Sequence, residues 1–194
     1  MQTPQEVFLG TVKADRSCGT CIACCVIPHI DTPELKKPVD TQCANCTGTG
    51  CAIHASRPEI CRSFECGYKR LIGMPPEARP DRCGAMITIE VDSPASGVFD
   101  NIYYLVSTSQ DPATLKSPAL DRVVQSLSRG PVPIYIYWQG FKTLIHPPKQ
   151  VAMAVLHPAD ASPTMAAEAS RWLKAYAPYA RAVAGPDVNL PPGY

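Results

Sequence analysis

The spacing of hydrophobic and polar residues predicts regular elements mainly in the second part of the chain. Ala85–Val91 and Asn101–Ser107 are rich in β-branched and aromatic residues, which predicts two strands. Val132–Trp138 and Phe141–His146 are separated by two residues, Gln and Gly, which predicts a β-hairpin. Val151–Leu156 has the composition of a further strand.

Two helices are predicted in the same part of the chain. Ser117 precedes a proline, and apolar residues follow at helical spacing from Leu120 to Leu127, before Gly130 ends the run. Ser162 also precedes a proline and begins the second predicted helix, which Pro178 is expected to kink or end. Residues 85–194 therefore predict an α+β unit with a β-hairpin and two helices.

Residues 1–84 are poorer in residues that form a core. Leu, Ile, Val and Phe number 15 in residues 1–84, or 18%, and 26 in residues 85–194, or 24%. A segment below roughly 20% in these residues has too little apolar surface to offset the entropy lost on folding. We therefore expect the first region to be a small module of short helices and loops, held by covalent or metal cross-links. The predicted boundary lies between residues 84 and 85.

The cysteines sharpen this division, because all ten lie between Cys18 and Cys83. The first residues lack a basic and apolar leader, and no apolar run reaches the ~20 residues of a membrane span. These features predict a cytoplasmic protein without membrane contact. In that compartment clustered CxxC pairs favour metal binding over a disulfide scaffold or ordinary buried thiols. The formal net charge of +1 argues against a nucleic-acid partner.

The cysteine spacings predict three groups of metal ligands. On a helix the first four sulfurs would form one stripe facing a common site. The second group has a CxxC turn, and the third follows Pro58 at the start of a predicted helix. The predicted ligands are Cys18, Cys21, Cys24, Cys25, Cys43, Cys46, Cys51, Cys61 and Cys66. Nine thiolates suit two tetrahedral zinc sites, a bridged pair, or zinc with an iron–sulfur cluster.

Other residues near these cysteines are weaker candidates for a role in the metal site. Cys83 adjoins the first predicted strand, and we expect a small buried side chain rather than a ligand. His54 follows Cys51 by three residues and is a reserve ligand. Arg57 and Arg62 either screen the charge of the thiolates or pair with nearby glutamates.

The chain contains the motif CxxCxxCC, which is followed by Gly50-Cys51-Ala52-Ile53-His54 and by Arg57-Pro58-Glu59-Ile60-Cys61-Arg62-Ser63-Phe64-Glu65-Cys66. This combination resembles the YkgJ-type cysteine-cluster family, which is largely bacterial. The resemblance covers residues 18–84. It implies a zinc- or iron-chelating domain with ligands at Cys18, Cys21, Cys24, Cys25, Cys51, Cys61 and Cys66. His54 departs from the tyrosine common in that family, and the pair Cys43 and Cys46 is additional.

No catalytic signature accompanies the cysteines, so the sequence leaves enzymatic activity open. The first functional hypothesis is a metal-binding protein that holds zinc, or iron, for a structural or metal-handling role. The second is an iron–sulfur protein in electron transfer or in a redox enzyme. The third is a zinc-supported protein-interaction module, in which the aromatic run Tyr135, Tyr137 and Trp138 contacts a protein partner instead of forming part of a core hairpin.

Overall fold

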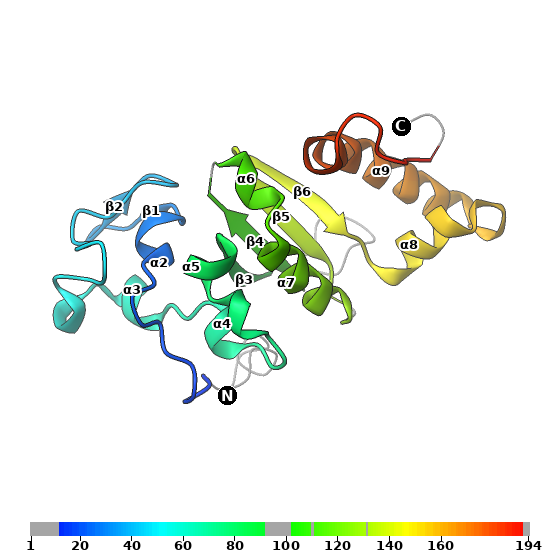
Figure 1. Ribbon diagram of the computed structural model, residues 1–194. Coiled ribbons are helices and arrows are strands. Elements are labelled where there is room, and N and C mark those ends of the chain that lie inside the picture. The colour runs from blue at the N-terminus through cyan, green and yellow to red at the C-terminus, as the bar shows by residue number, and fades with distance from the viewer. Residues whose placement is uncertain (1–11, 92–101, 110, 131, 192–194) are drawn as a thin grey trace. The chain divides into compact units, whose positions relative to one another are not determined.

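The computed structural model describes residues 12–91, 102–109, 111–130 and 132–191 (Figure 1). The described residues contain both helices and strands, which confirms the predicted α+β class. The first residues of the chain, on which the cytoplasmic prediction rests, lie outside the described part. None of the described helices combines the length and the apolar character that a membrane crossing needs.

The elements before residue 85 are short. They are α2 (Ala23–Val26), β1 (Ile30–Asp31), β2 (Lys36–Lys37), a 3-10 turn at His54–Ser56, α3 (Glu59–Ser63), α4 (Gly67–Arg70), a 3-10 turn at Pro76–Ala78 and α5 (Pro80–Cys83). β1 and β2 pair antiparallel, with Ile30 opposite Lys37. Across residues 12–66, all of which are described, Ile27 is the only buried hydrophobic side chain. This stretch therefore has almost no apolar core.

Four longer strands form one sheet in the order β3 (Ala85–Val91), β4 (Ile102–Thr108), β5 (Ile134–Trp138) and β6 (Phe141–His146). Four predicted strands are confirmed, although β4 extends to Thr108 and β5 begins at Ile134 instead of Val132. Asn101, where the second strand was predicted to begin, lies outside the described residues. The predicted hairpin is confirmed as the antiparallel pair β5–β6, with Trp138 opposite Phe141. Gln139 and Gly140 have φ angles of +49° and +82°, as the two-residue turns favoured by twisted hairpins require.

Helices complete the C-terminal part of the chain. They are α6 (Pro112–Leu115), α7 (Pro118–Ser128), α8 (Lys149–Leu156), a 3-10 turn at Pro158–Asp160 and α9 (Pro163–Ala184). α7 confirms the first predicted helix. The strand predicted at residues 151–156 is wrong, because these residues form α8, with Val151 and Ala154 buried at the spacing of one helical turn.

α9 begins where the second helix was predicted, and Ser162 accepts a hydrogen bond from the backbone N–H of Met165 as its N-terminal cap. It does not end at Pro178 but continues to Ala184. Proline removes one helical donor, and the carbonyl affected belongs to Lys174. Both residues are exposed, so water can satisfy that carbonyl.

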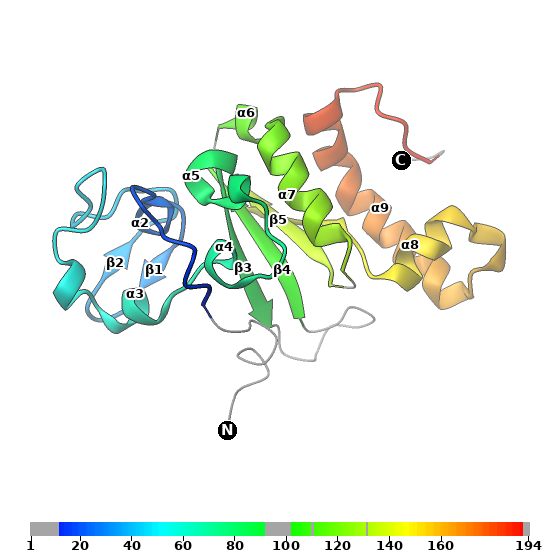
Figure 2. The same ribbon diagram turned by 60° about the horizontal axis from the view of Figure 1, so that its bottom comes forward.

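The chain packs as two compact units. The first comprises Met1–Ile89 and Val106–Ser126, and the second comprises Glu90–Leu105 and Leu127–Tyr194. Fully buried side chains of the first unit include Ile87, Val106, Leu120 and Val123, and those of the second include Ile134, Ile136 and Val151. In the second unit α8 and α9 lie side by side (Figure 2). All ten cysteines belong to the first unit. The predicted boundary between residues 84 and 85 stays a prediction.

A glycine at the start of α4 allows this short helix to approach the core. A Cβ atom at Gly67 would lie 2.9 Å from Cγ2 of Ile87 and 3.0 Å from Cδ1 of Leu71. We expect Gly67→Ala to lower the free energy of unfolding by about 1–3 kcal/mol, because packed side chains must shift. Chemical denaturation measures this change. Gly130→Ala is the control, since its Cβ would meet only Leu127 O at 3.5 Å, and an equal loss there would contradict the explanation.

Candidate metal-binding site

The predicted ligand cysteines lie on turns and on the shortest helices of the first unit. All ten cysteines are free thiols, and Cys83 is the only buried one among them. The first four do not share one helix, so the predicted helical stripe is wrong. α2 begins only at Ala23. Before it, Gly19 has a φ of +55° inside a turn closed by the hydrogen bond from Cys21 N–H to Cys18 O, of 3.0 Å. A residue in the left-handed region interrupts a helix.

Arg16 holds the segment before the first cysteine against α4. Its Nη1 donates to the carbonyl oxygens of Tyr68 and Leu71, at 2.6 and 2.8 Å, and its Nη2 donates to that of Met74, at 3.2 Å. Its guanidinium also lies 5.4 Å from the centre of the Tyr68 ring. α4 starts directly after Cys66. These contacts bring the loop that begins at Cys18 to the thiol of Cys66, which lies far along the chain.

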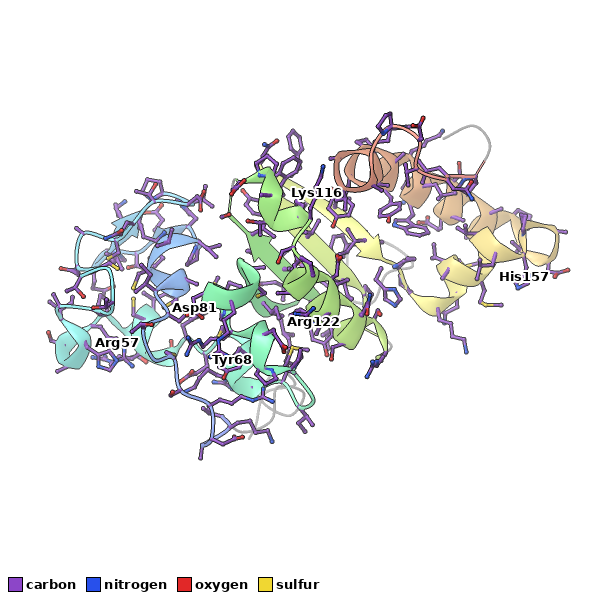
Figure 3. The ribbon with its side chains drawn as sticks, in the orientation of Figure 1. Arg57, Tyr68, Asp81, Lys116, Arg122 and His157 are labelled. Carbon is purple, nitrogen blue, oxygen red and sulfur yellow. The ribbon has the colours of Figure 1, made fainter. Side chains whose placement is uncertain are left out.

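The turn from Cys18 to Cys21 also contacts α5. A Cβ atom at Gly19 would lie 3.0 Å from Nη1 of Arg79, so the guanidinium packs on this glycine. Arg79 forms a two-bond ion pair with Asp81, with Nε–Oδ1 at 2.7 Å and Nη2–Oδ2 at 2.8 Å. Burial raises the pKa of the Cys21 thiol, and the backbone of Asp81, a residue labelled in Figure 3, acts against that rise. The loop thus has a fixed position on α5.

The thiols around this turn influence one another's pKa. Burial raises the pKa of Cys66 to about 11, and the nearby charges of Cys18 and Cys21 add to the shift. Burial of its sulfur likewise raises the pKa of Cys24, and the same two thiols contribute. We call Cys18, Cys21, Cys24 and Cys66 the first thiol group.

Backbone hydrogen bonds collect another set of cysteines. Cys43 N–H donates to Cys25 O at 2.8 Å, and Cys46 N–H donates to Cys43 O at 2.9 Å. Cys46 and Cys51 pair across an isolated antiparallel bridge, which closes the Gly- and Thr-rich loop between them. This scaffold places the CxxC turn beside the end of the CxxCxxCC motif, although 17 residues separate Cys25 from Cys43.

The cysteines that these backbone contacts connect also influence one another's pKa. Burial raises the pKa of Cys25 to about 12, and the charges of Cys24, Cys46 and Cys43 act in the same direction. Burial also raises the pKa of Cys61 on α3, with Cys43 and Cys51 contributing. We call Cys25, Cys43, Cys46, Cys51 and Cys61 the second thiol group.

The structure separates Cys61 from Cys66, which the sequence placed on one helix. α3 ends at Ser63, and Cys66 is the residue that precedes α4. Phe64, between the two helices, has an extended backbone with a ψ of 126°. The two thiols therefore do not share one helix.

Lys37 is a buried charged side chain beside the second thiol group, and no motif or spacing in the sequence pointed to it. It is 3% exposed, and its Nζ donates to the carbonyl oxygens of Val26, Pro38 and Thr41 at 2.6, 3.0 and 3.0 Å. Three acceptors satisfy all three ammonium protons. Burial lowers the pKa of Lys37, while the charges of Cys43 and Cys25 oppose that shift.

The two arginines singled out in the sequence differ in their surroundings. Arg57 lies next to α3 (Figure 3) and donates from Nε to Cys61 O at 3.3 Å. Its charge lowers the pKa of Cys61, against the larger effect of burial. Arg62 instead pairs with Glu59 on the surface, which is the predicted alternative of pairing with a nearby glutamate. A screening role is therefore open to Arg57 and not to Arg62.

Cys83 and His54 have other partners in this structure. The Cys83 thiol is 1% exposed and donates to Ala85 O at 3.2 Å, in keeping with a small core residue. His54 Nε2 lies 2.6 Å from Nη1 of Arg57, which also donates to His54 O at 3.0 Å.

The donor chemistry of these groups fits a soft or borderline metal ion. Thiolates bind zinc at about 2.3 Å and also ligate iron–sulfur clusters. In the part of the chain that the structure describes, no three His, Cys, Asp or Glu side chains converge closely enough to hold an ion. Closing either group on a metal therefore requires cysteine side chains to rotate, and each has a single χ1 torsion with staggered alternatives.

Comparisons with known proteins gave no relative: no family model, no curated protein and no solved structure matches the chain. The resemblance to the YkgJ-type family therefore stays a prediction that rests on the cysteine spacings.

Proposed function

We propose that this protein binds metal through the thiolates of its N-terminal region, with zinc as the ion and iron as the alternative. One observation carries the proposal. Residues 12–66 bury a single hydrophobic side chain, that of Ile27, yet they form a defined set of turns that carries nine thiols. A segment with so little apolar burial needs another source of folding free energy. Metal–thiolate bonds supply such energy.

The raised pKa values argue against a redox-active role for Cys25 and Cys66. Burial keeps the thiols of Cys25 and Cys66 protonated near neutral pH in the absence of metal, with pKa values of about 12 and about 11. Reactive cysteines in redox enzymes have lowered pKa values instead. A bound cation would displace the protons and make thiolates stable in this setting. These thiols thus lack the lowered pKa of a reactive nucleophile.

The proposed role is structural or metal-handling. A zinc ion with four thiolate ligands has no open position for water, so it stabilises a fold and does not activate a nucleophile. The sequence shows no catalytic signature that would add a reaction. An iron–sulfur centre is the second candidate, because the first thiol group supplies the four cysteines that such a cluster takes.

Anaerobic purification followed by elemental analysis and a visible spectrum tests this proposal. We expect colourless protein that contains zinc in a fixed ratio to the chain. Broad absorption near ~400 nm, together with iron and acid-labile sulfide, would establish the iron–sulfur alternative. Protein that contains neither metal, and that takes up none when folded with zinc or iron under reducing conditions, would refute metal binding altogether.

A further inference from the structure

We propose that Cys46 and Cys51 are a redox-sensitive pair, which a small-molecule disulfide such as oxidised glutathione converts into an intramolecular disulfide bond. The backbone hydrogen bonds around these two residues set their side chains face to face. The bond between them requires no metal, and only its effect on metal binding rests on the proposed function.

The two cysteines occupy opposite positions of the isolated antiparallel bridge in the first unit. In such a ladder, opposite residues either bond to each other through their backbones or lie between two flanking hydrogen bonds. Cys46 and Cys51 lie at the second kind of position. The flanking hydrogen bonds are Thr47 N–H to Gly50 O, at 3.0 Å, and Ala52 N–H to Asn45 O, at 2.8 Å.

This position brings opposite residues as close together as an antiparallel ladder allows. The Cα atoms of such a pair lie about 4.5 Å apart, and both side chains point to the same face. A disulfide joins Cα atoms that are about 4.4–6.8 Å apart, so Cys46 and Cys51 can be linked while the bridge stays intact. Both are free thiols here, and rotation about χ1 brings their sulfurs together.

The pair also lies within reach of a small oxidant. Both cysteine side chains are half-buried, and residues 47–49 of the loop between them are exposed. Gly48 in this loop has a φ of +86°, which glycine adopts at no steric cost, so the loop reverses the chain without strain. Cys83, by contrast, is 1% exposed and closed to the same reagent.

Cys43 is the competing partner for Cys46, because the two residues form a CxxC turn. Cys46 N–H donates to Cys43 O at 2.9 Å, which closes that turn. The first and last Cα atoms of a turn can lie as far as about 7 Å apart. Opposite residues of the bridge are closer and face the same side, so the backbone favours Cys51 as the partner.

The bond forms by thiol–disulfide exchange in two steps. The thiolate of one cysteine attacks a sulfur of oxidised glutathione, forms a mixed disulfide and expels one glutathione thiolate. The second cysteine then attacks the protein sulfur of that mixed disulfide and expels the second glutathione thiolate. The two protein thiols thereby lose two electrons and two protons, and both pass to the glutathione disulfide, which leaves as two thiols.

If the proposed function holds, this oxidation weakens metal binding. Cys46 and Cys51 are two of the predicted ligands, and a sulfur within a disulfide is no longer a thiolate. Zinc has no redox chemistry of its own, so the oxidant acts on the cysteines and the ion leaves unchanged. Oxidation should therefore release zinc, and reduction should allow zinc to bind again.

Graded oxidation of the full-length wild-type protein tests the pairing. The protein is equilibrated with mixtures of reduced and oxidised glutathione, free thiols are alkylated, and mass spectrometry with fragmentation locates each disulfide. We expect the bond between Cys46 and Cys51 to be the first protein disulfide to appear as the mixtures become more oxidising. A first bond between Cys46 and Cys43, or mixed disulfides with glutathione alone, would overturn the proposal.

Serine variants and a denatured control separate the bridge from mere proximity in the sequence. Cys43→Ser should keep the disulfide, whereas Cys51→Ser should leave Cys46 as a mixed disulfide with glutathione. In denaturant the wild-type protein should lose its preference, so that Cys43 and Cys51 compete for Cys46. The same product ratio with and without denaturant would show that the bridge does not direct the pairing, and this measurement needs no variant to fold.

Zinc release during the same oxidation tests the effect on metal binding. A chromophoric zinc chelator should report loss of zinc in step with the Cys46–Cys51 bond, and Cys83→Ser should behave as the wild type does. Zinc that stays bound after the bond is complete would overturn this effect. A disulfide that forms in protein unable to take up any metal would refute the proposed function and support the redox-sensitive pair, so the two failures are distinguishable.

Discussion

Removal of the proposed metal is expected to unfold residues 18–66 and to leave the β5–β6 hairpin and helices α8 and α9 folded. Structural zinc contributes about 10–16 kcal/mol to the folding of small domains, which is as large as the whole stability of a typical domain, about 5–15 kcal/mol. In residues 12–66 only Ile27 is available as a buried hydrophobic side chain to replace that energy. The second unit buries Ile134, Ile136 and Val151 and contains no cysteine.

Hydrogen exchange read by mass spectrometry measures this effect peptide by peptide. After treatment with a chelator under reducing conditions, amides of residues 18–66 should exchange rapidly, while those of β5 and β6 keep their protection. Adding zinc back should restore protection, which controls for damage by the chelator. Unchanged protection of residues 18–66 in protein shown to be free of metal would mean that the short elements need no cross-link.

Replacing the buried Lys37 by methionine is expected to lower the free energy of unfolding of the region that holds the second thiol group. The substitution removes the donors that serve Val26 O, Pro38 O and Thr41 O. Hydrogen bonds to a charged group contribute roughly 1.5–3 kcal/mol each, so we expect a loss of at least about 3 kcal/mol. It also removes a positive charge beside Cys25 and Cys43, which should weaken zinc binding at that group.

The neighbouring lysine provides a matched control. Lys36 lies on the same strand with its side chain 76% exposed, where it pairs with Asp31 at 2.9 Å. An exposed pair of this kind contributes little, so Lys36→Met should change stability and zinc binding only slightly. Chemical denaturation and competition with a colorimetric zinc chelator give the two readouts. Equal effects of both substitutions would show that the charge of this strand, and not the buried position of Lys37, is what matters.

Periodicity predicted the C-terminal elements where the local preference and the final packing agree. β3 has the predicted bounds, and α7 starts at the predicted proline. The helix at Lys149–Leu156 was missed because Val151 and Val155 suggest a strand, whereas burial at Val151 and Ala154 shows a helical face. A run of six residues holds too few turns for its period to be recognised.

The cysteine spacings identified candidate ligands but not their grouping. Gly19 in the left-handed region interrupts the predicted helical stripe of thiols, and the end of α3 at Ser63 places Cys61 and Cys66 on different elements. Backbone conformation of this kind depends on long-range contacts such as that of Arg79 with Gly19. Lys37 was missed for a related reason: only a recognised strand would show that Lys36 and Lys37 face opposite sides, and β2 is two residues long.

The three carbonyl oxygens that accept hydrogen bonds from Arg16 have a consequence for proteolysis. A trypsin-like protease must take an arginine side chain into its own specificity pocket before it cleaves the following bond. Arg16 cannot enter such a pocket while its guanidinium binds Tyr68 O, Leu71 O and Met74 O. Cleavage after Arg16 therefore requires that the chain first release α4. The susceptibility of this one bond reports whether the segment that carries Cys18 is docked.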